Sequence, residues 1–473
     1  MDLNFNVLLF LGDSMNRYKK LFSNSAIFAI GNLGSKIITF LMVPLYTRYL
    51  TTSQYGKSDV LSTLVSLLTP VFTLSVIDAV FRFALDKKSE NGYVLTGGIV
   101  VSSISLLIFI VIIPFISKIN YGVYVCVLTY ASAVESMFQQ FARGIGKSKL
   151  YAATGILMTL VTVLSNILLI VVMGWRLSGY LASMLIAQIV GIIFLFISLS
   201  AWKYIKLKNI NRQLILKMLV YSIPLIPNAI SWWLSNSANK IFIIILLGSS
   251  ANGIYAVANK IPSLISVFYS IFTQAWQISA VEEFKSKDAG EFFSIVLNAT
   301  ISILFIGVSI LTMFSKLFTH ILATSSYYSA WRIVPWLSLA VLYSCISSFL
   351  GTVYTTSMKT GQLLSTTIVG ATVNVIANLI LIPLVGVVGA GIGAMMSFMV
   401  VSILRLRGSR RFVHILIKWK IILFSQMFIF FEIFVMYVYK SRFSMVMALL
   451  IVIVISFINS KEFVPVIKRF LNK

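Results

Sequence analysis

Three lysines, Lys36, Lys240 and Lys260, stand inside segments that are otherwise apolar enough to cross a lipid bilayer. A charged side chain at the bilayer centre costs about 2.5 to 3.5 kcal/mol on insertion scales, so such residues usually face a wet cavity and mark a substrate path. Each lysine lies about 10 to 15 Å from the outer end of its expected helix, at a rise of about 1.5 Å per residue. The lysines therefore predict one cationic cavity for an anionic substrate. The alternative is structural: they snorkel outward, or pair across helices with Asp78 or Glu135.

Polar side chains accompany the three lysines on their helices. In the first and seventh expected helices they are Asn24, Asn32, Ser35, Thr39, Asn228, Ser231, Ser235, Asn236 and Asn239. Around and after Lys260 they form a stripe: Asn259, Ser263, Ser266, Ser270, Gln274 and Gln277. Spacings of three and four residues place side chains on one helical face. The first helix of each half is thus predicted to be wet, and the stripe to face the same polar interior.

The elements that position these residues follow from the composition. The chain has 473 residues, of which 59% are hydrophobic and 11% charged, and its mean hydropathy is +0.96. This excludes a soluble globular protein. Apolar runs of about 20 residues recur along the chain, and they must be helices because backbone groups in hydrocarbon have no water to bond. We predict an all-α polytopic membrane protein with about 14 spans, at residues 22–46, 58–81, 93–116, 120–142, 152–173, 178–201, 218–247, 252–280, 292–315, 331–356, 362–384, 387–404, 420–438 and 443–460.

The formal net charge of +25 is explained by membrane topology and not by nucleic-acid binding. Roughly 27 Lys and Arg residues fall on the side of the N-terminus and roughly 8 on the opposite side, which is the positive-inside pattern. Both termini are therefore predicted to be cytoplasmic. The densest basic cluster is interpreted as a topology signal that touches anionic headgroups; it comprises Arg405, Arg407, Arg410, Arg411, Lys418 and Lys420.

The sequence offers no place for chemistry outside the bundle. Its loops do not exceed a couple of dozen residues, and no GxxxxGK phosphate loop is present, which argues against ATP-driven transport. Cys126 and Cys345 lie in apolar stretches and are interpreted as packing residues. His320 and His414 lie far apart in the sequence, so no metal site and no cofactor is predicted. The function must lie inside the membrane.

The two halves of the chain resemble each other. The run from Asn166 to Gly174 matches the run from Asn378 to Gly386, and a glycine follows five residues later in both, at Gly179 and Gly391. The turn LTTSQYG at 50–56 likewise matches LGSSANG at 247–253. Units with an even number of helices enter the membrane from the same side, so these are predicted to be parallel repeats with the substrate site between them. The predicted lobes are 1–210 and 211–411, followed by two additional helices and a cytoplasmic tail in 412–473.

Intramembrane acids are fewer than the basic residues. Asp78 is one turn from Arg82 and Glu135 is two turns from Arg143, so each pair can neutralise itself along its own helix. Glu432 is the third acid. Asn374 and Asn378, with Thr372, can either hold a coupling cation or make hydrogen bonds between helices, and the second role is favoured.

Several stretches resemble polysaccharide flippases of the multidrug/oligosaccharidyl-lipid/polysaccharide exporter superfamily. They are GIYAVANK at 253–260 with QAW at 274–276 and the glutamates at 282–283, DAVFRF at 78–83, FARGIGK at 141–147 and NLILIP at 378–383. The resemblance covers the whole chain. It implies two six-helix lobes plus two helices, alternating access, and movement of an undecaprenyl-pyrophosphate-linked oligosaccharide across the bacterial inner membrane.

By this resemblance, cationic and polar side chains of the bundle hold pyrophosphate or acidic sugars and hydrogen-bond the glycan. The candidate substrate-binding residues are Lys36, Lys240, Lys260, Asn32, Asn236, Asn259, Gln274, Arg82 and Arg143. The expected partners are the lipid-linked oligosaccharide, membrane lipids, and the polymerase and chain-length regulator of the same pathway. Coupling to a proton or sodium gradient is suggested by the superfamily alone.

Two rival functions remain open at this point. A drug exporter of the same superfamily is expected to carry acids in its cavity when its cargo is cationic, whereas lysines predominate here. A membrane polymerase or ligase for O-antigen is expected to have a large outer loop with catalytic Arg or His residues, and no such loop is visible. The sequence therefore favours a transporter over an enzyme.

Overall fold

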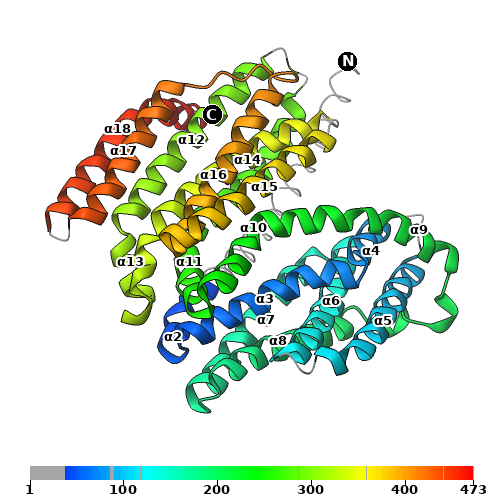
Figure 1. Cartoon of the computed structure of the whole chain (residues 1–473). Helices are drawn as coiled ribbons and strands as arrows, with labels where there is room; N and C mark the ends of the chain where they lie inside the picture. The colour runs from blue at the N-terminus through cyan, green and yellow to red at the C-terminus, as the bar shows by residue number, and fades with distance from the viewer. Residues whose placement is uncertain are drawn as a thin grey trace, which may run out of the picture. The chain divides into compact units, whose positions relative to one another are not determined.

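Every regular element in the described part of the chain is a helix, as the computed structural model shows (Figure 1). The structure describes residues 38–471 apart from 86–89, 117–119, 285, 287, 358–359 and 440–441. Nine of the described helices are long and apolar enough to cross a membrane, or ten when a bent pair is counted as one span. Shorter apolar helices lie at Asn91–Ile104 and Ser237–Leu247. The predicted all-α polytopic fold is confirmed, while the total of about 14 spans stays a prediction.

The chain forms two compact units. The first contains the described residues of Met1–Met42 and Leu61–Ala229, and the second contains Val43–Val60 and the described residues of Ile230–Lys473. The chain passes from one unit to the other three times: between Met42 and Val43, within helix α3 (Thr52–Phe72) and within α10 (Ile226–Leu247). The lobe boundaries expected at 210 and 411 stay a prediction.

The first unit is built around α6 (Gly122–Gly144), against which α4 (Val76–Ala84), α5 (Asn91–Ile116) and α8 (Arg176–Ser198) pack. Its other elements are α7 (Ser148–Asn166), a π-helical segment η1 (Ile167–Val172), the short turns η2 (Ala201–Lys203) and η3 (Leu207–Asn209), α9 (Arg212–Ser222) and η4 (Ile223–Leu225).

Two predicted spans of this part of the chain are broken. The span expected at 58–81 is bent by 64° between α3 and α4. Pro70 lies inside α3 and supplies no N–H, and Leu74 and Ser75 then adopt positive φ. The span expected at 218–247 is interrupted by the tight 3-10 turn η4, which contains Pro224. Pro224 supplies no N–H for a helical hydrogen bond, which explains the break at this place.

The second unit is centred on α14 (Val334–Thr356), which is 78% buried in its apolar window. Helix α11 (Ser249–Glu283), α12 (Ala289–Met313) and α16 (Val387–Ser409) pack on it, α15 (Thr360–Val385) packs on α16, and α17 (Trp419–Val438) and α18 (Arg442–Leu471) pack on α12 (Figure 1). The remaining elements of the unit are α2 (Val43–Tyr49), α13 (Ser315–Leu322) and η5 (Ser325–Arg332).

The two turns that match in sequence pack against each other in the second unit. The hydroxyls of Thr52 and Ser250 are 2.6 Å apart and those of Ser53 and Ser249 are 2.7 Å apart. Because Thr52 and Ser53 match Ser249 and Ser250 in the sequence repeat, each contact is the symmetric copy of the other. Backbone atoms of the two turns also lie close together at Gly56 and Gly253, the last residues of the two matching turns. The second sequence match therefore corresponds to a local two-fold contact.

The first sequence match also has a structural counterpart in the two units. Gly174 and Gly386 both adopt positive φ, at +69° and +66°, at the turns between α7–η1 and α8 and between α15 and α16. Only glycine reaches this backbone region without steric cost. Beyond Gly386, Gly389 lies against the backbone of Leu381, so α15 and α16 pack closely, as expected of small residues in membrane helices.

The segment around Tyr327 fastens α2 to the elements that follow α12. The Tyr327 hydroxyl donates a hydrogen bond of 2.9 Å to the carbonyl of Leu50, and the Thr324 hydroxyl donates one of 3.0 Å to the carbonyl of Thr47. Burial raises the pKa of Tyr327, which keeps its hydroxyl protonated as a donor. This contact fixes the start of α3 within the second unit.

Trp276 anchors α11 in the core of the second unit. Its ring stacks on Phe349 with centroids 4.1 Å apart, and its indole N–H donates a hydrogen bond of 2.8 Å to the hydroxyl of Thr352. Substituting Trp276→Phe is expected to lower the free energy of unfolding by about 1 kcal/mol from the lost hydrogen bond. Thermal unfolding in detergent measures the loss. The double variant Trp276→Phe/Thr352→Val should lose less than the sum of the two single losses, and strict additivity would contradict the bond.

Candidate functional site

Lys240 on α10 is paired with an acid that the sequence analysis did not single out. Its Nζ lies 3.0 Å from Oδ1 of Asp59 on α3, and the two side chains are 16% and 18% exposed. The other carboxylate oxygen of Asp59 lies 3.4 Å from the amide nitrogen of Asn252, which also donates 2.9 Å to the carbonyl of Gly56. The local two-fold contact at Gly56 thus positions the acid. Lys240 thus pairs across helices, as the structural alternative expected, but its partner is Asp59 and not Asp78 or Glu135.

Lys260 on α11 belongs to the same group of charges. It interacts electrostatically with both Asp59 and Lys240. Within the described part of the chain its amine has no hydrogen bond and no ion pair, and the neighbouring amide of Asn259 also has no hydrogen bond. Asp59 therefore lies near two lysine amines and forms its ion pair with Lys240. The amine of Lys260 makes no hydrogen bond within the described residues, so its donors are unused there.

A chain of buried amides extends from this group to α15. The amide nitrogen of Asn378 donates hydrogen bonds to the side-chain oxygens of Asn239, at 2.6 Å, and Asn374, at 2.9 Å. The amide nitrogen of Asn239 in turn donates a hydrogen bond of 3.1 Å to the hydroxyl of Tyr255. The expected hydrogen bonding between helices by Asn378 is confirmed. No group of three or more His, Cys, Asp or Glu side chains suited to a metal occurs among the described residues.

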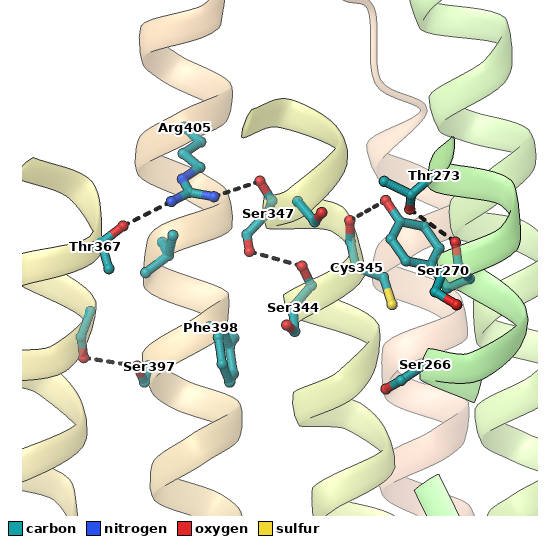
Figure 2. Close-up of a pocket in the computed structure, with 14 residues that line it drawn as sticks. Ser266, Ser270, Thr273, Ser344, Cys345, Ser347, Thr367, Ser397, Phe398 and Arg405 are labelled. Carbon is teal, nitrogen blue, oxygen red and sulfur yellow. Dashed lines mark hydrogen bonds between the residues drawn. The ribbon is translucent and has the colours of Figure 1, made fainter. Parts of the chain in front are cut away.

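A cavity of about 310 Å³ lies inside the second unit, between α11, α14, α15 and α16 (Figure 2). Its lining is rich in hydroxyls: Ser266, Ser270, Thr273, Ser344, Ser347 and Ser348 from α11 and α14. Thr367 and Ser397 contribute from α15 and α16, and Tyr269 and Phe398 add aromatic surface. Ser266 and Ser270 come from the predicted polar stripe, which therefore faces this cavity in part.

Arg405 on α16 is the charged residue of this cavity. Its side chain is 5% exposed. Its guanidinium donates three hydrogen bonds: one of 2.8 Å to the carbonyl of Ser347, one of 3.1 Å to the hydroxyl of Thr366 and one of 3.0 Å to the hydroxyl of Thr367. Figure 2 shows the guanidinium held between Ser347 and Thr367. The expected contact of Arg405 with anionic headgroups is therefore wrong, because its side chain points into the protein.

The other predicted binding residues are distributed as follows. Lys36 and Asn32 lie outside the described residues, and so do the side chains of Asn236 on α10 and Gln274 on α11. Asn259 lies beside Lys260 on α11. Arg82 and Arg143 belong to the first unit, so within a single unit the structure brings together only Lys240, Lys260 and Asn259 among the described candidates.

Arg82 and Arg143 do not form the ion pairs that the sequence suggested. Both are exposed, and no ion pair links Arg82 to Asp78 or Arg143 to Glu135 in the described residues. The Arg143 guanidinium lies over the ring of Phe81 at 4.6 Å from its centroid. Glu135 is buried, and its Oε1 has no hydrogen-bond partner among the described residues. Spacing along one helix therefore did not predict the partners of these side chains.

Sequence reasoning thus missed two residues, Asp59 and Arg405. Asp59 lies three residues after Gly56, at the first turn of an expected span, where an acid looks like an ordinary end-of-helix charge. The sequence repeat could have drawn attention to Asp59, because the turn before it matches the turn before Tyr255. Arg405 had no signal, since it is the first residue of a run of basic side chains.

Comparison with known proteins agrees with this architecture. A family profile described as polysaccharide biosynthesis protein matches residues 21–277, which is more than half of the chain. Among curated proteins, the chain is 25% identical over 273 residues to Lsg locus putative protein 1 of Haemophilus influenzae. That alignment covers 54% of this chain and 65% of the relative, so the chain spans less than two thirds of that relative's length.

Solved structures show the same fold at low sequence identity. The lipid II flippase MurJ in an inward closed conformation matches with a TM-score of 0.68 and 14% identity, covering 95% of this chain and 100% of that one. A multidrug/oligosaccharidyl-lipid/polysaccharide superfamily transporter from Pyrococcus furiosus, described for the reverse polarity of its binding pocket, matches with a TM-score of 0.60 and 16% identity, covering 83% and 95%. Both matches show a shared fold over most of the chain.

Proposed function

Because the chain belongs to the polysaccharide biosynthesis protein family, we propose that it is a flippase for lipid-linked oligosaccharides. Its cargo is an undecaprenyl-pyrophosphate-linked repeat unit, which it moves from the inner to the outer leaflet of the bacterial inner membrane by alternating access. The match to the family profile is the observation that carries this proposal. The fold supports it, since a flippase for lipid II has the same architecture over its whole length.

The charge cluster of the second unit suits an anionic cargo. Because Lys240 is paired with Asp59, Lys260 is the lysine of the cluster that is left to meet a cargo. A pyrophosphate carries negative charge on oxygens that accept hydrogen bonds from an ammonium group. We therefore assign the pyrophosphate contact to Lys260, with Asn259 beside it. Lys240 has a structural role in this proposal, because its ion pair with Asp59 links α10 to α3.

The setting of the proposed flippase follows from its cargo and its charge pattern. We place it in the inner membrane with both termini in the cytoplasm, where the basic loops meet anionic lipids. The polymerase and the chain-length regulator of the same pathway receive the cargo after translocation. A proton or sodium gradient drives the cycle in this proposal.

Lys260→Gln is expected to lower glycan export about tenfold or more in a flippase-deleted host that makes the cognate glycan, because one charge-assisted hydrogen bond to the cargo is lost. Surface glycan and the lipid-linked intermediate in the cytoplasmic leaflet are quantified together, at matched membrane levels of protein. The intermediate should accumulate in the cytoplasmic leaflet. Lys206→Gln, an exposed lysine outside the membrane helices, is the matched control and should export normally.

Three outcomes would count against the proposal or part of it. Normal export by Lys260→Gln would make this lysine structural. Intermediate that reaches the outer leaflet without the protein, but stays unpolymerised, would favour a polymerase. Resistance of the host to cationic drugs without any glycan export would favour a drug exporter, against the assignment of an anionic cargo to the cluster.

A further inference from the structure

We infer that the hydroxyl-lined cavity around Arg405 is a binding subsite for an acidic sugar of the cargo. The site lies wholly within the second unit, between α11, α14, α15 and α16. The inference rests on the proposed function for the identity of the cargo, and on the cavity itself for its chemistry.

Arg405 carries a charge that no acid of the described chain balances. The side chain is 5% exposed, and it has no ion pair with any Asp or Glu of the described chain. Its three hydrogen bonds go to neutral oxygens of Ser347, Thr366 and Thr367. Buried charges are normally paired, since an unpaired ion loses its hydration without compensation. A guanidinium that borders a cavity without a protein counter-ion therefore points to an anionic ligand.

The guanidinium of Arg405 keeps two N–H donors that make no hydrogen bond within the described residues. Arginine has five N–H donors in a planar fork, and three of them are used within the described residues. The remaining donors, one on each terminal nitrogen, match the two coplanar oxygens of a carboxylate. The contacts to Ser347 and Thr367 fix the plane of the fork before any ligand arrives.

The rest of the cavity lining also suits a sugar. The hydroxyls of Ser266 and Ser344 border the cavity and have no hydrogen-bond partner among the described residues. Tyr269 and Phe398 provide aromatic surface on which the apolar face of a sugar ring can pack. The cavity volume of about 310 Å³ is at the lower end of small-molecule pockets, about 300 to 1,000 Å³. A single carboxylated sugar ring fits this combination better than a chain of sugars does.

Binding of radiolabelled D-glucuronate to the detergent-purified full-length protein, measured by equilibrium dialysis, tests the inference. Unlabelled D-glucuronate should compete for the site, whereas D-glucose and acetate should compete at least about tenfold less well, because each lacks one half of the recognised chemistry. Arg405→Lys keeps the charge but loses the fork, and it should weaken binding about tenfold or more.

A second variant keeps the test independent of the structural role of Arg405. Ser266→Ala/Ser344→Ala removes two hydroxyls without internal partners and should weaken binding about tenfold at unchanged thermal stability. Ser365→Ala, an exposed serine on α15 bonded to the carbonyl of Gln362 of its own helix, should bind like the wild type. Equal binding by wild type, Arg405→Lys and the double serine variant would overturn the inference.

Two further results would overturn it as well: no saturable binding of glucuronate, or stronger competition by inorganic phosphate than by glucuronate, which would assign the cavity to a phosphate group. This dialysis experiment is separate from the export assay. Export without glucuronate binding would contradict the subsite and leave the flippase proposal standing. Glucuronate binding without export would support the subsite and contradict the flippase proposal.

Discussion

Substituting Gly253→Ala is expected to lower the free energy of unfolding by about 3 kcal/mol, and Gly253→Val to abolish the folded protein. A Cβ at position 253 would overlap the carbonyl oxygen of Thr52 and lie 2.9 Å from its carbonyl carbon. These are backbone atoms of α3, which cannot rotate away as a flexible side chain can. The helices α3 and α11 would have to separate, and the hydrogen bonds of the matching turns would be lost.

The local two-fold contact makes a second prediction at Gly56. There a Cβ would overlap the carbonyl oxygen of Ser249 and lie 2.6 Å from the nitrogen of Gly253. Gly56→Ala should therefore cost as much as Gly253→Ala. Thermal unfolding in detergent and the yield of monodisperse protein measure both. Gly361→Ala on α15, where an added Cβ meets no atom within 4 Å, is the control and should be neutral or slightly stabilising. Unequal losses at the two glycines would contradict the two-fold contact.

Asp59→Asn is expected to cost about 2 kcal/mol or more and to reduce export, because it leaves Lys240 and Lys260 as neighbouring cations without a carboxylate. Removing one member of a fully buried ion pair costs about 3 to 5 kcal/mol, and the pair here is 16% and 18% exposed, so the loss is somewhat smaller. The substitution raises the net charge of the cluster by one. Asparagine keeps the size of the side chain, so the effect reports the charge.

The double variant Asp59→Asn/Lys240→Gln provides the control. It restores the net charge that the cluster has in the wild type, and it should therefore regain most of the stability and part of the export. The thermal unfolding midpoint and surface glycan are measured for the two single variants and the double variant. If the two single losses simply add in the double variant, the ion pair between Lys240 and Asp59 is not formed in the protein.

The sequence predicted the fold class and the order of the helices because these depend on local chemistry. Apolar runs of about 20 residues must form helices in hydrocarbon whatever they pack against, and glycines such as Gly174 and Gly386 mark turns through their own backbone freedom. The break near Pro224 could be predicted for the same reason. The bend between α3 and α4 was missed, since Leu74 and Ser75 carry no sequence signal for positive φ.

The site was predicted only in part. Lysines in apolar segments could be recognised one by one, and so could the polar stripe that reaches Ser266 and Ser270, because charge and periodicity are properties of a single helix. The tertiary structure alone decided that Lys240 is neutralised by Asp59, 181 residues away in the sequence, while Lys260 keeps its donors. It also decided that Arg405 turns inward to a cavity. The partner of a charge is set by which helices cross and how closely, and that depends on long-range packing that no single segment encodes.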